Sequence, residues 1–159
     1  MVAELMSLLS STPAVEKTLQ MARVRYEKHL ALYANLSLRR VLGKLMEFGD
    51  GIVQAMASRE ATEVTLIPAY SRTNARRVLS AYTLRELRRA LEMVYQRVTK
   101  HFGETGLSMV QAVWRAIQDE FAKEFVKYEE CVGKAYVGTD VKLYFTVADA
   151  MACFGEIAH

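Results

Sequence analysis

Hydrophobic residues recur every three or four positions from Leu107 to Tyr136, which is the clearest helical pattern in the chain. The stripe that they form consists of Val110, Val113, Trp114, Ile117, Phe121, Phe125, Tyr128 and Val132. The opposite stripe is polar and consists of Gln111, Arg115, Asp119, Lys123, Lys127, Glu130 and Lys134. We expect acid-then-base pairs on that solvated face, Asp119 with Lys123 and Glu130 with Lys134. The pattern predicts a central helix whose core positions are Val113, Trp114, Ile117, Phe121, Phe125 and Tyr128.

A second, longer helical pattern lies upstream. Ser11-Thr12-Pro13 is typical of a helix start, with Thr12 as the N-cap, and apolar spacing then continues to about Ala57. Each glycine costs about 1 kcal/mol in a helix interior, so Gly49-Asp50-Gly51 can either kink the helix or end it. The apolar spacing resumes beyond that tripeptide, which favours one continuous helix. Residues 1–10 have the spacing of a helix remnant.

The remaining segments are shorter and begin at residues with capping chemistry. A connector with one helical turn is expected over residues 58–70. The predicted caps are Ser71 or Thr73 for a helix ending near residue 81, Thr83 for one ending near residue 102, Ser108 for the central helix, and Thr146 for a last helix over residues 147–157. Glu86 and Asp149 complete the spacing of a capping motif. The predicted fold is all-α, an elongated bundle of long antiparallel helices.

Composition bounds the class of protein. With 159 residues, 52% of them hydrophobic, the chain is long enough for a single domain with its own core. No signal-peptide pattern is present, because Glu4 interrupts the start and no basic region precedes the apolar residues. No apolar run approaches the roughly 20 residues that cross a bilayer. Cys131 and Cys153 provide no disulfide framework, which favours a cytoplasmic location.

Catalytic and metal-binding chemistry is not indicated by any motif. The three histidines are isolated from one another and from the cysteines. The chain has neither a serine nucleophile elbow nor a glycine-rich phosphate loop. Adjacent carboxylates such as Asp119-Glu120 diverge on a helix and do not share a site. We therefore expect no enzyme, no cofactor, no metal and no small-molecule substrate.

Charge is distributed unevenly along the chain. Residues 70–101 contain eight Lys or Arg and two Glu, whereas residues 102–159 contain five Lys or Arg and nine acids. The candidate functional surface is an arginine cluster made of Arg72, Arg76, Arg77, Arg85, Arg88 and Arg89, with a second basic group at Arg39, Arg40 and Lys44. Four hypotheses remain open: a solvated face paired with the acidic C-terminal third, an acidic protein partner, an anionic membrane, and nucleic acid. Nucleic acid is the least favoured, since no lysine tails or exposed aromatics interleave the arginines.

Several short stretches resemble one known family. They are Val113-Trp114, Gln118-Asp119-Glu120-Phe121, Tyr128 and Phe145-Thr146-Val147-x-Asp149, with Leu91-x-x-Val94-Tyr95-x-x-Val98-x-Lys100-His101 and Leu38-Arg39-Arg40-x-Leu42-x-Lys44-Leu45 upstream. In order and spacing they are similar to the C-terminal end of the exocyst complex component one family. The likeness runs from about Leu36 to the terminus and is strongest over residues 95–147. It departs at Tyr136-Val137-Gly138, where the family usually has a Pro-Gly turn, and at Arg40-Val41, where it tends to have Arg-Pro.

The resemblance implies a function that the residue pattern alone does not. Family members are rods of stacked helical bundles, a CATCHR-like architecture shared by tethering complexes, and they tether secretory vesicles to the plasma membrane. Residues 1–159 would then be one C-terminal domain of a longer, non-catalytic subunit at the cytoplasmic side of secretion sites. Its partners would be other exocyst subunits, contacted through the arginine cluster or the last helix. The alternative is a module that binds anionic phospholipid through the same arginines.

Overall fold

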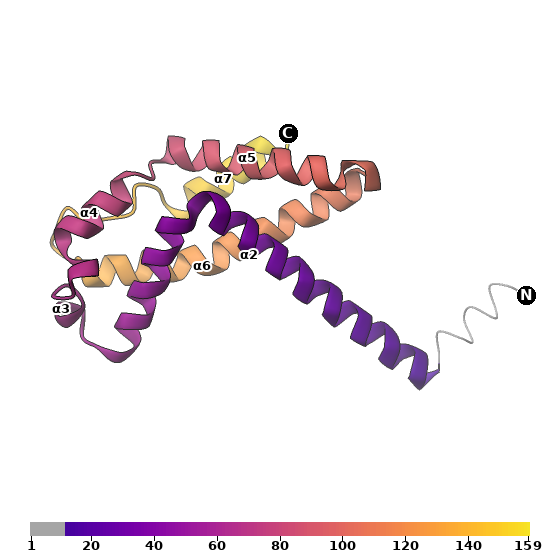
Figure 1. The fold of residues 1–159 in the computed structure, drawn as a ribbon, viewed down its shortest axis with the longest axis horizontal. Helices are drawn as coiled ribbons and strands as arrows, with labels where there is room; N and C mark the ends of the chain where they lie inside the picture. Colours follow the sequence, from indigo (N-terminus) through magenta and orange to yellow (C-terminus); the bar gives the residue numbers. More distant parts are fainter. Residues whose placement is uncertain (1–11) are drawn as a thin grey trace, which may run out of the picture.

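The computed structural model describes residues 12–159, and these form an elongated all-α fold (Figure 1). The expected helix remnant at residues 1–10 lies outside the described residues. The helices, including two short 3-10 turns, are α2 (Pro13–Ser58), α3 (Ala61–Val64), η1 (Pro68–Tyr70), α4 (Arg72–Ser80), α5 (Leu84–Phe102), η2 (Gly103–Thr105), α6 (Leu107–Ala135) and α7 (Val147–Ile157). The fold class is therefore as predicted.

Helix α6 forms the centre of the core, and its predicted extent is confirmed to within one residue. The apolar stripe packs against α2, α5 and α7, and all six predicted core positions are buried. Phe121 and Phe125 stack with their ring centroids 4.0 Å apart. The Trp114 indole Nε1 donates a hydrogen bond to the Phe154 carbonyl at 3.2 Å, which satisfies a buried polar atom.

The opposite stripe of α6 is exposed as predicted, but one of its two predicted ion pairs is wrong. Glu130 and Lys134 pair at 2.5 Å, whereas Lys123 contacts Glu120 and Glu124 instead of Asp119. Glu120 and Glu124 lie nearer the core, with side chains only 12% and 15% exposed. Water screens their charges less than that of the exposed Asp119, so they attract Lys123 more strongly.

Helix α2 is continuous to Ser58, as the apolar spacing favours, and Gly49-Asp50-Gly51 neither ends nor kinks it. The non-helical residue is Leu42, with φ −117° and ψ 20°, and not the glycine tripeptide. Figure 1 shows the helix changing direction sharply over the body of the molecule. The bend turns Leu45, Met46 and Ile52 into the core, where each is at most 1% exposed. The free energy gained by burying these side chains therefore exceeds the cost of the non-helical backbone at Leu42.

Thr12 is the N-cap residue of α2, as predicted, and three further predicted caps are confirmed by hydrogen bonds to their side chains. Ser71, Thr83 and Thr146 each accept a hydrogen bond from the backbone three residues on, and Asp149 completes a reciprocal capping box. Ser108 does not cap α6; the helix begins one residue earlier, after Gly106. Gly106, whose φ of +121° residues with a side chain rarely adopt, is the N-cap instead, so Ser108 already lies in the first turn of the helix.

Candidate functional site

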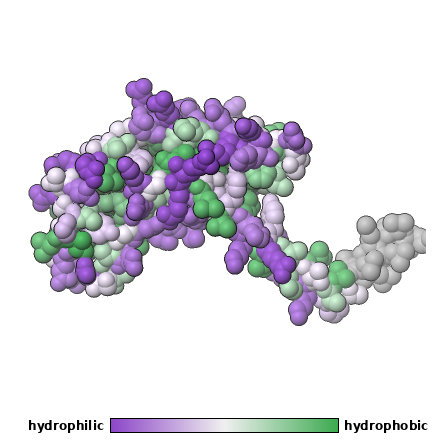
Figure 2. All heavy atoms as spheres, viewed as in Figure 1, coloured by the Kyte–Doolittle hydropathy of each residue, from purple (hydrophilic) through white to green (hydrophobic). Residues whose placement is uncertain are grey.

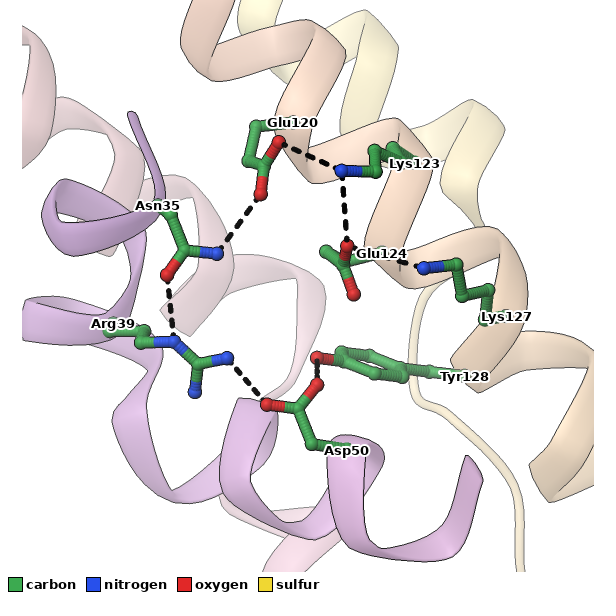
Figure 3. Close-up of polar contacts among 8 residues, drawn as sticks. All are labelled: Asn35, Arg39, Asp50, Glu120, Lys123, Glu124, Lys127 and Tyr128. Carbon is green, nitrogen blue, oxygen red and sulfur yellow. Dashed lines mark hydrogen bonds and ion pairs between the residues drawn. The ribbon is translucent and has the colours of Figure 1, made fainter. Parts of the chain in front are cut away.

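A polar cluster lies where the bend of α2 meets α6 (Figure 3). The Asp50 carboxylate accepts a hydrogen bond from Arg39 Nη2 at 2.5 Å and another from the Tyr128 hydroxyl. Asn35 accepts from Arg39 Nε at 2.8 Å and donates to Glu120 at 3.0 Å. Arg39 lies before Leu42 and Asp50 after it, so the cluster joins the two halves of α2 to each other and to α6.

The pKa shifts in this cluster indicate that it holds α2 and α6 together, as a structural brace, and does not act as an acid–base pair. Burial, reinforced by the hydrogen bond to Asp50, raises the pKa of Tyr128 well above its usual range. The same carboxylate raises the pKa of Arg39. At neutral pH the phenol therefore keeps its proton and the guanidinium its charge, and neither group is poised for proton transfer.

Neighbouring glycines explain why the cluster forms here. A Cβ at Gly49 would lie 2.6 Å from the Tyr128 ring, and one at Gly51 would lie 2.0 Å from the Tyr70 hydroxyl. The glycine tripeptide does not break the helix; it is the surface against which two aromatic rings pack. No periodicity in the sequence marks it, although a Gly-x-Gly inside an otherwise regular helix is a signal of close approach.

The arginine cluster lies on the exposed surfaces of α4 and α5, and part of it is engaged internally. Arg76 pairs with Asp140 at 2.7 Å, and Arg88 pairs with Glu92 at 3.3 Å and Glu156 at 2.6 Å. Asp140 and Glu156 belong to the acidic C-terminal third, as the solvated-face hypothesis expected. The hydrogen bond from Arg76 holds the pKa of Asp140 below its usual value.

The remaining arginines have fewer partners. Arg77 Nη2 donates to Asn74 at 2.8 Å on the same helix. Within residues 12–159, neither the Arg85 nor the Arg89 side chain has a hydrogen bond or an ion pair. Arg72, Arg77 and Arg85 line three different hollows, so the six arginines do not form one continuous site.

One of these hollows brings together the two basic groups that are separate in the sequence. A groove with a volume of about 480 Å³ runs between α2, η1 and α4. Lys44, from the second basic group, and Arg77, from the arginine cluster, both line it. Sequence reasoning named both residues but had no means of placing them side by side.

The first half of α2 is an arm that projects from the body (Figure 1). From Thr12 to His29 every residue except Val15 is exposed. Apolar side chains are among them, and Figure 2 shows hydrophobic patches along the arm; Leu19, Met21 and Val24 are 59%, 51% and 53% exposed. We name residues 13–29 the arm.

The last helix offers little apolar surface outward. Phe154 is buried, and Met151 and Ile157 pack partly against the core. Its exposed positions are Ala148, Asp149, Ala152, Gly155 and Glu156. A partner that recognises α7 would therefore meet small and acidic side chains.

The part of the chain that the structure describes contains two free cysteines and no cluster suited to a metal ion. No three His, Cys, Asp or Glu side chains gather there for a metal ion. Burial raises the pKa of the Cys131 and Cys153 thiols, which keeps both protonated at neutral pH. Between residues 12 and 159 no helix combines the length and hydrophobicity of a membrane span.

Comparison with known proteins identifies relatives of the chain. The family described as exocyst complex component Sec3, C-terminal, matches residues 1–138. Exocyst complex component 1 of Drosophila melanogaster is 32% identical over 147 residues, which are 92% of this chain and 16% of the fly protein. The mouse (Mus musculus) protein of the same name is 32% identical over 139 residues, or 86% of this chain and 15% of its own length. The chain thus spans about a sixth of these relatives. No solved structure shows significant similarity to it.

Proposed function

We propose, from the premise that this chain belongs to the family of exocyst complex component Sec3, that it is a non-catalytic module of a complex that tethers secretory vesicles to the plasma membrane. The observation that carries the proposal is the family match over residues 1–138 together with 32% identity across most of the chain. A brace in place of an acid–base site, and protonated thiols, agree with a module that acts by contact.

The chain corresponds to the C-terminal region of a longer subunit. Support comes from the description of the matching family as C-terminal and from the 15–16% of each relative's length that the chain covers. One core cluster extends from α2 to α7, which supports a single domain. The location that follows is cytoplasmic, at the periphery of the plasma membrane, and the architecture is a CATCHR-like rod module.

Other exocyst subunits are the partners, and the unpaired arginines are the contact residues. Arg85 and Arg89 lie one helical turn apart on α5 and are exposed. An acidic surface on a partner would complement them, and such complementarity mainly increases the association rate and the specificity. Arg76 and Arg88 are poorer candidates, because a partner must displace their internal carboxylates.

A binding experiment with purified proteins tests this proposal. The chain is immobilised and each other exocyst subunit is passed over it at about 150 mM salt, where the Debye length is about 8 Å. We expect at least one subunit to bind, and the double variant Arg85→Glu, Arg89→Glu to lower the association rate about tenfold. Arg115→Glu on α6 is the matched control, since Arg115 is exposed and has no ion pair among the described residues. Absence of binding to every subunit would contradict the proposal.

An anionic membrane is the second candidate, and the same two unpaired arginines favour it. Phosphatidylserine and phosphoinositide headgroups attract each basic residue near the surface by about 1 kcal/mol. Flotation with phosphatidylcholine vesicles, with and without these lipids, separates the candidates. Binding to the anionic vesicles that disappears in the double variant, with no binding to subunits, would replace the protein-contact proposal.

A further inference from the structure

The groove between α2 and α4 has an apolar floor that is held in place. Its lining comprises Lys44, Glu47, Phe48, Ala69, Tyr70, Asn74, Arg77, Val78, Ala81 and Tyr82. Phe48 and Tyr70 meet edge to face with centroids 5.6 Å apart. The Tyr136 hydroxyl donates to the Tyr70 carbonyl at 2.6 Å, and the Tyr70 hydroxyl lies over Gly51. The floor is therefore preformed, which lowers the cost of ordering it on binding.

The rim of the groove carries more positive than negative charge. Lys44 and Arg77 are exposed and come from different helices, and Glu47 is the one acid among the lining residues. Arg77 is bonded only to the neutral Asn74, and Lys44 has no ion pair with any residue from 12 to 159. Arg40, one turn before Lys44, is exposed as well. The two cations thus remain available to an external anion.

The shape and charge together indicate the kind of occupant. A volume of about 480 Å³ lies within the range of about 300–1,000 Å³ typical of ligand sites, and the floor is aromatic and aliphatic. A membrane surface presents headgroups to a protruding basic face, whereas this apolar floor is recessed between helices. A peptide with a large apolar side chain next to carboxylates can pack that side chain on the floor and pair its carboxylates with the cations of the rim.

We propose that this groove binds a short acidic peptide segment of another exocyst subunit, with one large apolar side chain on Phe48, Val78 and Tyr82 and carboxylates at Lys44 and Arg77. The identity of the partner as an exocyst subunit rests on the proposed function. The groove is separate from Arg85 and Arg89, which lie further along on α5, so the two surfaces are testable independently.

Overlapping short peptides that tile the other exocyst subunits serve as the probe. Binding of each labelled peptide to the intact chain is measured by fluorescence anisotropy at about 150 mM salt. We expect the binding peptides to contain a large apolar residue next to Asp or Glu. The variants Lys44→Glu and Arg77→Glu should each weaken binding about tenfold, because a like charge then faces the carboxylates. Lys17→Glu on the arm and Arg115→Glu on α6 are matched controls that should change nothing.

Three results would overturn the groove proposal: no peptide binds, the binding peptides lack acidic residues, or the groove variants bind as tightly as the controls do. Vesicles containing phosphatidylserine are a parallel arm, and loss of vesicle binding in the groove variants without any peptide binding would assign the site to membrane. Intact subunits are measured alongside. If they bind and the groove variants leave that binding unchanged, the groove proposal fails while the proposed function stands; if none binds, the proposed function fails.

Discussion

The ring of Tyr128 packs closely against the backbone of α2 at Gly49. A Cβ at Gly49 would lie only 2.6 Å from the ring. The Tyr128 hydroxyl donates a hydrogen bond to Asp50, the residue that follows Gly49 in α2. Tyr128 is 1% exposed, so its ring has no room to withdraw. The packing of Tyr128 explains why a glycine, which is unfavourable inside a helix, stands at position 49. It also explains why the half-buried residue 50 is an aspartate, which accepts the hydrogen bond of the Tyr128 hydroxyl.

Alanine replacements of Gly49 and of Gly133, both inside helices, should have opposite effects on stability. Gly49→Ala should lower the free energy of unfolding by about 1–3 kcal/mol, because the new methyl group overlaps the Tyr128 ring. Gly133→Ala should raise it by about 0.5–1 kcal/mol, because nothing lies within 4 Å of its Cβ position and alanine favours the helix. Urea unfolding followed by circular dichroism measures both. A Gly49→Ala protein as stable as Gly133→Ala would contradict the packing at Tyr128.

The hydroxyl of Tyr128 should make the fold sensitive to alkali. Its pKa is raised in the folded protein, so the stability it contributes is complete below the usual tyrosine value of 10.0 and is lost as the pH rises above 10. Tyr128→Phe should cost about 1.5–3 kcal/mol at pH 8 through the lost bond to Asp50. Its stability should then fall less between pH 8 and pH 11 than that of the wild type. Tyr136, whose pKa is raised to about 12, is present in both proteins and contributes the same alkaline loss of stability to each. If the stability of Tyr128→Phe and of the wild type fell in parallel between pH 8 and pH 11, the alkali sensitivity would not come from Tyr128.

At the scale of elements, the two halves of α2 differ in what supports them. Beyond Leu42 the helix is buried against α6 and closed by the Asp50 cluster. Before it, the side chains of residues 16–29 are exposed, and the Tyr26 hydroxyl contacts the Met109 sulfur of α6 at 3.9 Å. Most helical stability in proteins comes from tertiary packing, so the arm is stabilised mainly by its continuity with the rest of α2.

Hydrogen exchange should separate the arm from the body. Amides of residues 17–25 should open with a free energy near zero, whereas those of α6 should require nearly global unfolding, a difference of roughly 100-fold or more in protection. Mass spectrometry of peptides from the intact chain provides the measurement. As a matched pair, Leu19→Ala on the arm should change stability by less than about 0.5 kcal/mol and Leu38→Ala in the core should cost about 2–5 kcal/mol. Equal protection in arm and body would show that the arm is covered in the isolated chain.

The whole molecule is united at Trp114. Its ring meets Tyr95 of α5 and Phe154 of α7, both at a centroid distance of 4.9 Å, and its Nε1 bonds to the Phe154 carbonyl. Two exposed ion pairs, Arg76 with Asp140 and Arg88 with Glu156, also connect the basic middle of the chain to its acidic end. Exposed pairs of this kind contribute little stability, so the aromatic contacts hold the C-terminal segment in place.

Trp114→Ala should therefore destabilise the entire fold. We expect a loss of about 3–5 kcal/mol, typical of a large aromatic side chain removed from a core. Trp114→Phe, which keeps most of the ring packing, should lose less. Urea unfolding monitored by circular dichroism should show one transition for wild type and variants, as a single domain requires. A loss below about 1 kcal/mol, or two separate transitions, would contradict a core that is shared by α5, α6 and α7.

Local sequence determined most of the secondary structure. The bounds of α5, α6 and α7, the caps at Ser71, Thr83 and Thr146, and the buried stripe of α6 follow from spacing and capping chemistry that act within a few residues. The order of short stretches such as Gln118-Asp119-Glu120-Phe121 also carried the family resemblance that the comparisons confirmed. Ser108 was misplaced because the conformation of Gly106, which sets where α6 begins, is not visible in composition.

Only the tertiary structure decided the bend at Leu42, the internal partners of Arg76 and Arg88, and the meeting of Lys44 with Arg77 across one groove. Each depends on residues dozens of positions apart. Periodicity reports which side of a helix is buried, but not which helix covers it or which charge lies opposite. The arm shows the same limit: its apolar residues have the spacing of a buried stripe, and only the tertiary structure shows that the arm projects from the body and leaves Leu19, Met21 and Val24 exposed.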